Sequence, residues 1–161
     1  MDSNRIRNGD FTAGNFEHWT VSEFDGTAKV LRDGDGYRAR ITLGKNESVL
    51  LVTERFSIRR PAFKLSLEAS MPEPVDEDAG TTLYCTLAGY GPSLPFPIIL
   101  TIPFTLSGVS EGFEYMGEMR SAVTEVQFTI ALAPVSNPKA VGPIYIDNVK
   151  YTVDLSDKSV S

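Results

Sequence analysis

The sequence has very few of the side chains that usually carry nucleophilic, acid–base or metal chemistry. Its 161 residues include one cysteine, Cys85, and one histidine, His18. A single cysteine excludes an intramolecular disulfide and a metal site built from several cysteines. Cys85 lies within an alternating apolar segment, which predicts a buried and inert thiol. His18 directly precedes the only tryptophan, Trp19, and we interpret it as a bystander to that residue.

Catalytic motifs do not emerge from the remaining residues. Ser93 has the position of a hydrolase nucleophile within 91–95, but Pro95 stands where the strained turn of that motif requires glycine. The 21 acidic residues leave a two-carboxylate glycosidase site open, although the sequence marks out no particular pair. We therefore nominate no catalytic residue and predict that the protein is not an enzyme.

An excess of basic residues and a long apolar run are also missing. The chain has 15 Lys and Arg against 21 Asp and Glu, which gives a net charge of -6 and a pI near 4.8. Such a field repels nucleic-acid phosphates and anionic lipids, so we expect no nucleic-acid partner. No apolar run approaches the ~18 residues of a membrane span, and the N-terminal residues lack the apolar stretch of a signal peptide. We expect a protein without membrane insertion, either cytoplasmic or exported by a signal-independent route.

What remains is the composition of an ordinary soluble domain. Hydrophobic residues make up 42% of the chain and charged residues 22%. A chain of this length buries ~68–70% of its surface on folding, which is enough for a core without disulfides. We predict one domain over residues 1–154, followed by a frayed C-terminal tail at residues 155–161.

The dominant pattern is a strict alternation of apolar and polar residues. Ten prolines interrupt the chain, mostly in its second half, and leave few stretches long enough for typical helices. Period-two alternation predicts strands with one face toward a core. It occurs in four segments, residues 37–43, 63–69, 83–87 and 126–132. Several such strands separated by turn residues predict an all-β antiparallel β-sandwich.

Turn residues mark the connections between these strands. The sequence Asp-Gly-Asp-Gly at 33–36 tolerates positive φ and predicts a tight hairpin. Residues 71–80 and 89–97 are rich in proline and predict loops, and the glycines near residues 110–117 predict a further turn. Residues 46–56 fit either a strand or a short capped helix.

Both ends of the chain carry more specific motifs. Residues 8–19 contain Asn-Gly-x-Phe, a nearby glycine and then Trp19, while residues 144–151 read Ile-Tyr-Ile-Asp-Asn-Val-Lys-Tyr. In these two motifs the chain resembles the jelly-roll carbohydrate-binding modules of the cellulose- and xylan-binding type, which have a galactose-binding-domain-like fold. The resemblance implies that the last strand lies beside the first segment. Independently of it, burying Phe11 and Trp19 is worth roughly 1.5–3 kcal/mol each, so we interpret both as core anchors.

The resemblance also implies a possible structural calcium near the joined ends. Calcium prefers carboxylate and carbonyl oxygens, and the side chains we nominate are Asp10 and Asp147. The acidic residue that commonly follows the Phe of the motif is Thr12 in this sequence, which departs from the pattern. Asp33 and Asp35 do not form a calcium loop, because Gly44 occupies the position of its closing glutamate.

Outward positions of the alternating strands supply the candidate ligand-binding residues. Hydrogen-bonding groups and an aromatic face are what sugar recognition needs, and Tyr84, Gln127, Glu68 and Arg40 provide both if they share one surface. Two further candidates come from segments expected to be loops, Tyr90 and Tyr115. The simpler alternative is that the outward residues form only the solvated side of a sheet.

Two functions remain in competition at this point. The first is a non-catalytic module that binds a soluble glycan on a sheet face or on edge loops. The second is a structural or protein-interaction subunit of a surface assembly, phage particle or toxin, with a protein as its partner. Jelly rolls host many functions, so the fold alone does not decide between them.

Overall fold

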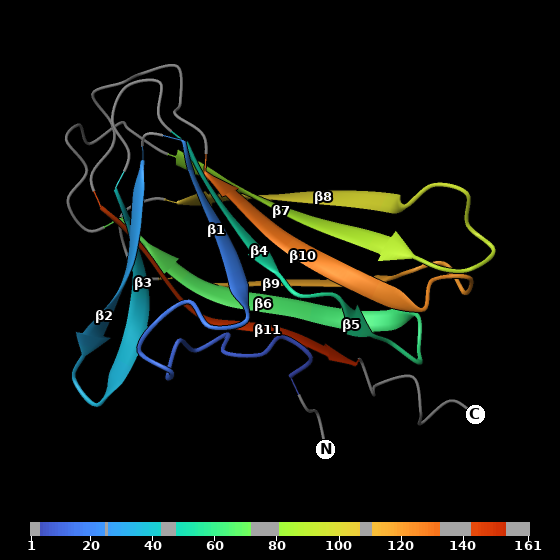
Figure 1. Cartoon of the computed structure of the whole chain (residues 1–161), viewed down its shortest axis with the longest axis horizontal. Coiled ribbons are helices and arrows are strands. Elements are labelled where there is room, and N and C mark those ends of the chain that lie inside the picture. The colour runs from blue at the N-terminus through green and yellow to red at the C-terminus, as the bar shows by residue number, and fades with distance from the viewer. Residues whose placement is uncertain are drawn as a thin grey trace.

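In the computed structural model, the described residues of the chain form eleven strands (Figure 1). The structure describes residues 4–24, 26–42, 48–71, 81–106, 111–132 and 143–153, and these include no helix. The strands are β1 (Trp19–Phe24), β2 (Thr27–Asp33), β3 (Gly36–Thr42), β4 (Ser48–Thr53), β5 (Phe56–Ser57), β6 (Ala62–Ser70), β7 (Thr81–Tyr90), β8 (Ile98–Leu106), β9 (Glu111–Glu118), β10 (Glu125–Leu132) and β11 (Ile144–Val153).

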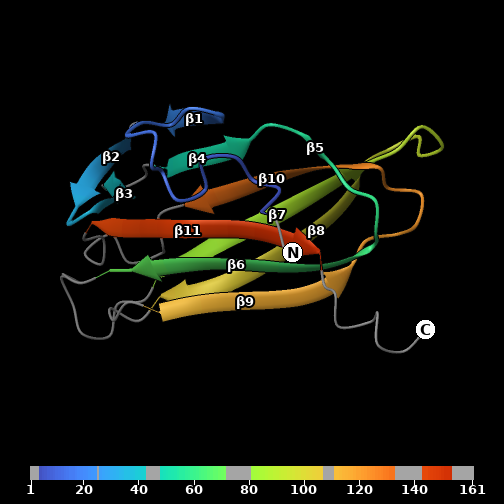
Figure 2. The same ribbon diagram turned by 90° about the horizontal axis from the view of Figure 1, so that it is seen from below.

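The strands form two antiparallel sheets that pack face to face (Figure 2). Sheet A has the order β1-β4-β10-β7-β8, with the short β5 paired to β10. Sheet B has the order β2-β3-β11-β6-β9. The predicted all-β antiparallel sandwich is therefore confirmed. The predicted loop at 71–80 lies outside the described residues except for Met71, and the predicted tail at 155–161 lies wholly outside them. Residues 46–47 of the segment 46–56 are also outside them.

The core lies between the sheets and is made by the inward half of each alternation. Leu65 and Leu67 of β6 face Cys85 and Leu87 of β7, and all four are at most 1% exposed. Phe128 on the central strand β10 is fully buried. The inward set that the alternation predicts is thus confirmed, because period two places every second side chain on the dry face.

Local turn chemistry agrees with the sequence at one hairpin and differs at another segment. Residues 34–35 connect β2 to β3, with Gly34 at a φ of 60°, as predicted. Residues 48–53 form a strand, which resolves the ambiguity of that segment. The predicted turn around residues 110–117 is wrong, because residues 111–118 form strand β9 at the edge of sheet B.

The N-terminal segment, residues 4–9, is hydrogen-bonded to the last strand, β11, but does not itself form a strand. The Arg5 amide donates to the Tyr151 carbonyl at 2.9 Å, and the Val149 amide donates to the Gly9 carbonyl at 2.9 Å. Asn4 adds two bonds, from its Nδ2 to the Val149 carbonyl and from the Tyr151 amide to its Oδ1, each of 2.9 Å. The two ends of the described chain therefore lie side by side (Figures 1 and 2), as the terminal motifs predict.

Large aromatic residues of the opening motif fill the end of the core. Phe11 is fully buried, and its ring centroid lies 5.7 Å from that of Trp19. The Trp19 indole Nε1 donates to the Asn8 carbonyl at 3.0 Å. Asn8 and Phe11 both have positive φ, 54° and 57°, so the segment turns tightly around the tryptophan. Both aromatics are core anchors, as expected from the sequence.

Candidate ligand-binding surfaces

Among the residues that the structure describes, the outer side of sheet A carries no charged side chain over its central part. The surface is formed by the side chains that point away from the core on five adjacent strands, and we call it face A. It consists of Thr20, Ser22, Leu50, Val52, Thr82, Tyr84, Thr86, Ala88, Ile99, Thr101, Pro103, Thr105, Gln127, Thr129 and Ala131. Charge enters only at its end, where Glu125 lies opposite Tyr90.

A row of β-branched side chains crosses the middle of face A. The strand registers align Thr20, Val52, Thr129, Thr86 and Thr101 across all five strands. The hydroxyls of Thr86 and Thr101 lie 3.3 Å apart, within hydrogen-bonding distance. The row, which we call the threonine row, therefore presents hydroxyl groups on the three neighbouring strands β10, β7 and β8 and on β1, with Val52 between them on β4.

Two large side chains stand exposed beside this row. Tyr84 is 44% exposed and lies opposite Ala131 on one side and Pro103 on the other. Ile99 is 57% exposed and lies opposite Ala88. An exposed tyrosine ring among short neighbours can stack against the C–H face of a sugar while its hydroxyl forms a hydrogen bond.

Gln127 is on the same face as Tyr84, as the alternation predicts. It lies opposite Ala88, one pair of outward positions away from the threonine row toward the charged end. Its Nε2 donates to the Thr53 carbonyl at 2.9 Å, which fixes the direction of the amide. The carbonyl half of a fixed amide is a directional acceptor for a hydroxyl group.

The outer side of sheet B has the opposite character. We call it face B, and it carries many charged side chains, some of which engage one another or neighbouring polar groups. The Lys64 ammonium lies 3.1 Å from the Glu114 carboxylate, and the Glu68 carboxylate accepts a bond of 2.9 Å from the Asn148 amide. The charged residues of face B, among those described, are Lys29, Asp33, Arg38, Arg40, Lys64, Glu68, Glu114, Glu118, Asp147 and Lys150.

An aromatic residue of face B is covered by a cation. The Arg38 guanidinium lies 3.8 Å from the centre of the Tyr145 ring, and its Nε lies 3.7 Å from the Asp33 carboxylate. Arg40 lies opposite Tyr145 on the neighbouring strand. The Tyr145 ring is therefore engaged within the protein, in contrast to that of Tyr84.

The four candidate sugar contacts do not share one surface. Tyr84 and Gln127 lie on face A, whereas Glu68 and Arg40 lie on face B, on the far side of the core. The expectation of a single cluster is thus wrong. Alternation tells which side chains point outward, but it does not tell to which of two sheets a strand belongs.

The two tyrosines predicted from loops both lie in strands. Tyr90 is the last residue of β7, and the Arg55 guanidinium covers its ring at 3.7 Å. Tyr115 lies within β9 and packs toward the core, with its ring centroid 6.0 Å from that of Phe63. Tyr115 is half-buried in this packing. The expected position at a loop edge is therefore wrong.

The two side chains nominated for calcium, Asp10 and Asp147, line different hollows of the surface. Asp10 lines a hollow together with Asn148 and Lys150, whereas Asp147 lines a different hollow with Glu68. Asp10 Oδ1 accepts bonds from the Thr12 amide and hydroxyl, at 3.2 and 2.9 Å. In the part of the chain that the structure describes, no three His, Cys, Asp or Glu side chains gather to hold a metal. Asp10 and Asp147 therefore do not belong to a described cluster of three acidic side chains.

Two buried or half-buried groups have shifted proton affinities. Burial raises the pKa of the Cys85 thiol to about 12, so the thiol stays protonated and unreactive in the folded protein. Burial also raises the pKa of Asp147, and the nearby charges of Glu68, Asp10 and Asp33 add to this effect. The backbone N–H of Asn148 donates to Asp147 Oδ1 at 2.8 Å, and this bond lowers the pKa of Asp147 in part.

Sequence reasoning missed the contribution of β8 to face A. Thr101, Pro103 and Thr105 alternate with buried residues, a signal that was available in the sequence. Pro103 obscured it, because proline usually argues against a strand. Strand β8 is an edge strand of sheet A, where proline is tolerated.

Comparison with known proteins identifies the fold. No family model matches the sequence, and no curated protein matches it. Among solved structures, TmCBM61 in complex with β-1,4-galactotriose is similar with a TM-score of 0.72 and 14% identity, over 94% of this chain and 99% of that one. The CBM22-2 xylan-binding domain of Paenibacillus barcinonensis Xyn10C gives a TM-score of 0.58 and 14% identity, over 90% and 97%.

A third similar structure belongs to a much larger protein. The enzymatically active domain of tailspike protein 4 from bacteriophage CBA120 gives a TM-score of 0.71 and 15% identity, over 93% of this chain. The chain spans 21% of that tailspike structure. Together with the terminal motifs, these matches show that the chain has the β-sandwich fold of carbohydrate-binding modules, over most of its length.

Proposed function

We propose that the protein is a non-catalytic module that binds a soluble glycan on face A. The observation that carries this proposal is that, among the residues the structure describes, no charged side chain lies in the central part of face A, in a chain with 15 basic and 21 acidic residues. Hydroxyl groups, a fixed amide and an exposed tyrosine occupy that surface instead. Similar structures include one with a bound galactotriose, which supports a saccharide ligand.

The physical basis is the low cost of removing water from such a face. Charged groups lose much favourable hydration when a ligand covers them, whereas hydroxyl groups exchange water for sugar hydroxyls at little net cost. The Tyr84 ring adds contact area for the apolar side of a sugar ring, and the threonine row adds acceptors and donors in fixed directions. We expect weak binding that depends on a few such contacts.

A substitution on each face tests the proposal. Tyr84→Ala removes the exposed ring of face A, and we expect about tenfold weaker binding, or about 1.4 kcal/mol. Tyr145→Ala removes a tyrosine of face B and should leave affinity unchanged. Binding is measured by calorimetry against β-1,4-galacto- and xylo-oligosaccharides, and the contact surface is mapped by chemical-shift changes. Equal losses in both variants, or shifts confined to face B, would contradict the proposal.

The second candidate function is a protein-interaction subunit. Two observations favour it. One is the match to a domain within a phage tailspike, and the other is Phe96, which is 79% exposed in the loop between β7 and β8. Under this alternative, Phe96→Ser weakens association between protein chains and leaves sugar binding untouched. Sedimentation of the wild-type protein and the Phe96→Ser variant, with and without sugar, separates the two functions.

A further inference from the structure

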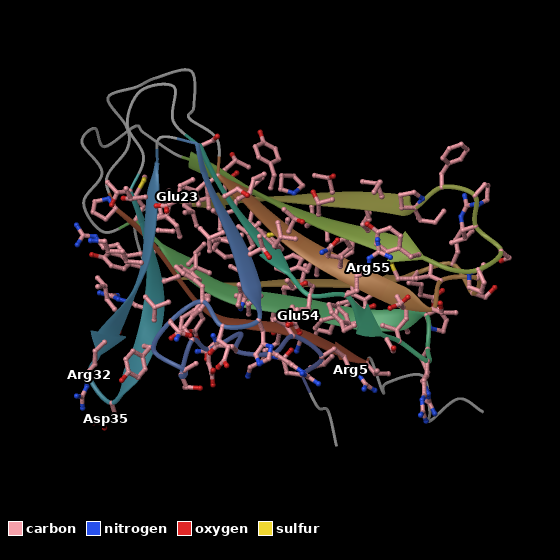
Figure 3. All side chains as sticks on the ribbon, viewed as in Figure 1. Arg5, Glu23, Arg32, Asp35, Glu54 and Arg55 are labelled. Carbon is pink, nitrogen blue, oxygen red and sulfur yellow. The ribbon has the colours of Figure 1, made fainter. Side chains whose placement is uncertain are left out.

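A second, differently charged site lies at the seam between the two sheets. A cleft of about 430 Å³ is bordered by the N-terminal segment on one side and by the stretch from Thr53 to Ser57 on the other. Figure 3 labels Arg5, Glu54 and Arg55, which lie around β5 at this seam. The full lining is Asn4, Arg5, Ile6, Arg7, His18, Thr53, Glu54, Arg55, Phe56 and Ser57.

The cleft is cationic in an acidic protein. Three arginines and one glutamate line it, so its formal charge with neutral histidine is +3 − 1 = +2, against -6 for the whole chain. The Glu54 carboxylate is engaged with His18, whose Nδ1 lies 3.1 Å from Oε1. Among the ion pairs between described residues, none involves Arg5, Arg7 or Arg55. Three arginines thus line one cleft without a described carboxylate partner.

Both walls of the cleft are held in place. The Arg55 guanidinium stacks on the Tyr90 ring at 3.7 Å, which restricts its side chain. The backbone of the N-terminal segment is tied to β11 by the Arg5 amide and by both ends of the Asn4 side-chain amide. Preorganised guanidinium groups lose less entropy when they bind an anion than free side chains do.

These features define the chemistry of the ligand. Guanidinium forks bind carboxylate and sulfate oxygens in pairs of parallel hydrogen bonds. A volume of about 430 Å³ exceeds that of a small inorganic anion and falls in the range of ~300–1,000 Å³ typical of small-molecule sites. Tyr90 and Arg55 connect the cleft to the end of face A, because Tyr90 belongs to the outward side of β7.

We infer that the seam cleft binds the carboxylate or sulfate ester of an acidic saccharide whose adjoining sugar units extend onto face A. The inference rests on the proposed glycan-binding function and narrows its ligand class. Arg5, Arg7 and Arg55 bind the anionic group, and Asn4 and Tyr90 position two of these arginines.

Pairs of ligands that differ only in charge test this inference. The probes are trigalacturonic acid beside its methyl ester, and a sulfated galactan oligosaccharide beside its desulfated form, with inorganic sulfate as a third arm. We expect the charged member of a pair to bind at least tenfold more tightly in calorimetry, and its affinity to fall as NaCl is raised. Which of the two pairs responds distinguishes a carboxylate from a sulfate ligand.

Matched arginine variants locate the site. Arg5→Gln, Arg7→Gln and Arg55→Gln each should weaken the charged probe by about tenfold and leave the uncharged probe unchanged. Arg59→Gln removes an exposed arginine that does not line the cleft, and it should have no effect. Circular dichroism and unfolding curves confirm that each variant is folded.

The outcomes separate this inference from the proposed function. Equal binding of charged and uncharged members, sensitive to Tyr84→Ala but not to the arginine variants, would overturn the inference and leave glycan binding on face A intact. If inorganic sulfate binds and none of the saccharides does, both the inference and the proposed function are overturned. The same holds if a folded protein binds none of the probes.

Discussion

Face A and face B are built on one core and differ almost entirely in what they show to solvent. The inward residues of both sheets are the same apolar types, for example Leu65 of sheet B and Leu87 of sheet A. Outward, face B carries many charged side chains, some of them paired with one another, whereas face A presents hydroxyl groups, an amide and the exposed Tyr84. Covering the charges of face B would strip their hydration, whereas the central part of face A has no described charge to strip, so the difference supports the proposal that face A is the binding side.

The strongest test of this comparison asks whether the two sheets are equivalent on the inside. Phe128→Ala in sheet A should cost about 3–5 kcal/mol in the free energy of unfolding, and Leu65→Ala in sheet B about 2–5 kcal/mol, because each leaves a cavity in a fully buried site. The outward neighbours serve as controls, and Thr129→Ala and Ser66→Ala should change stability by less than ~0.5 kcal/mol. Urea unfolding curves measure all four. A large cost for either outward change would show that its face has a structural role.

A charge placed on each face sharpens the comparison on the outside. Thr86→Glu puts a carboxylate in the middle of the threonine row, where covering it would strip its hydration, so we expect at least tenfold weaker glycan binding. Ser66→Glu adds the same charge to face B and should leave affinity unchanged. Calorimetry with the neutral oligosaccharides provides the measurement. Binding that survives Thr86→Glu would move the site away from face A.

Between the two faces, Tyr151 tests whether the core needs its one unpartnered hydroxyl. The Tyr151 ring stacks on Phe63 at 5.0 Å, but among the described residues its buried hydroxyl has no hydrogen-bond partner. Tyr151→Phe keeps the stacking and removes the orphan group, so stability should be unchanged or higher by about 1 kcal/mol. Thermal unfolding at pH 7 gives the result. A loss of more than ~1 kcal/mol would show that the hydroxyl is satisfied in solution.

The smallest expected effect concerns the pH dependence of face B. Because the pKa of Asp147 is raised in the folded protein, its contribution to stability is present below the unfolded pKa, about 4, and is lost as pH rises through the folded value. Asp147→Asn should therefore stabilise the protein slightly at pH 7, by less than ~1 kcal/mol, with no difference below about pH 4. Unfolding curves across pH 3–7 test this. If added Ca²⁺ stabilises the wild type and not the variant, the carboxylate binds metal after all.

Most of the fold was predictable because it follows from local chemistry. Alternation in residues 63–69 and 126–132 reports which side chains are buried, and the Asp-Gly-Asp-Gly turn reports a hairpin. The failure at β9 has a specific cause. Gly117 lies within the strand, and a Cβ there would lie 2.8 Å from the Tyr115 ring and 3.2 Å from the Phe63 ring, so the glycine serves packing rather than a turn.

The sites were less predictable, because they depend on which strands become neighbours. Glu68 and Tyr84 both point outward, and only the pairing of β6 with β11 and of β7 with β10 places them on opposite faces. The seam cleft joins Arg5 to Arg55, which are fifty positions apart and belong to different walls. No local period connects them. Long-range contacts of this kind are set by the whole fold rather than by any one segment.

The pairing of the N-terminal segment with β11 also determines how the molecule would respond to mechanical load. Arg5 is bonded to Tyr151 and Gly9 to Val149, so the two segments run in opposite directions with their outer ends together. Tension applied between those ends would open the bonds one after another, starting at Arg5, instead of shearing them all at once. The segment would peel away at low force while the sheets stayed intact, and the wall carrying Arg5 and Arg7 would be the first part lost.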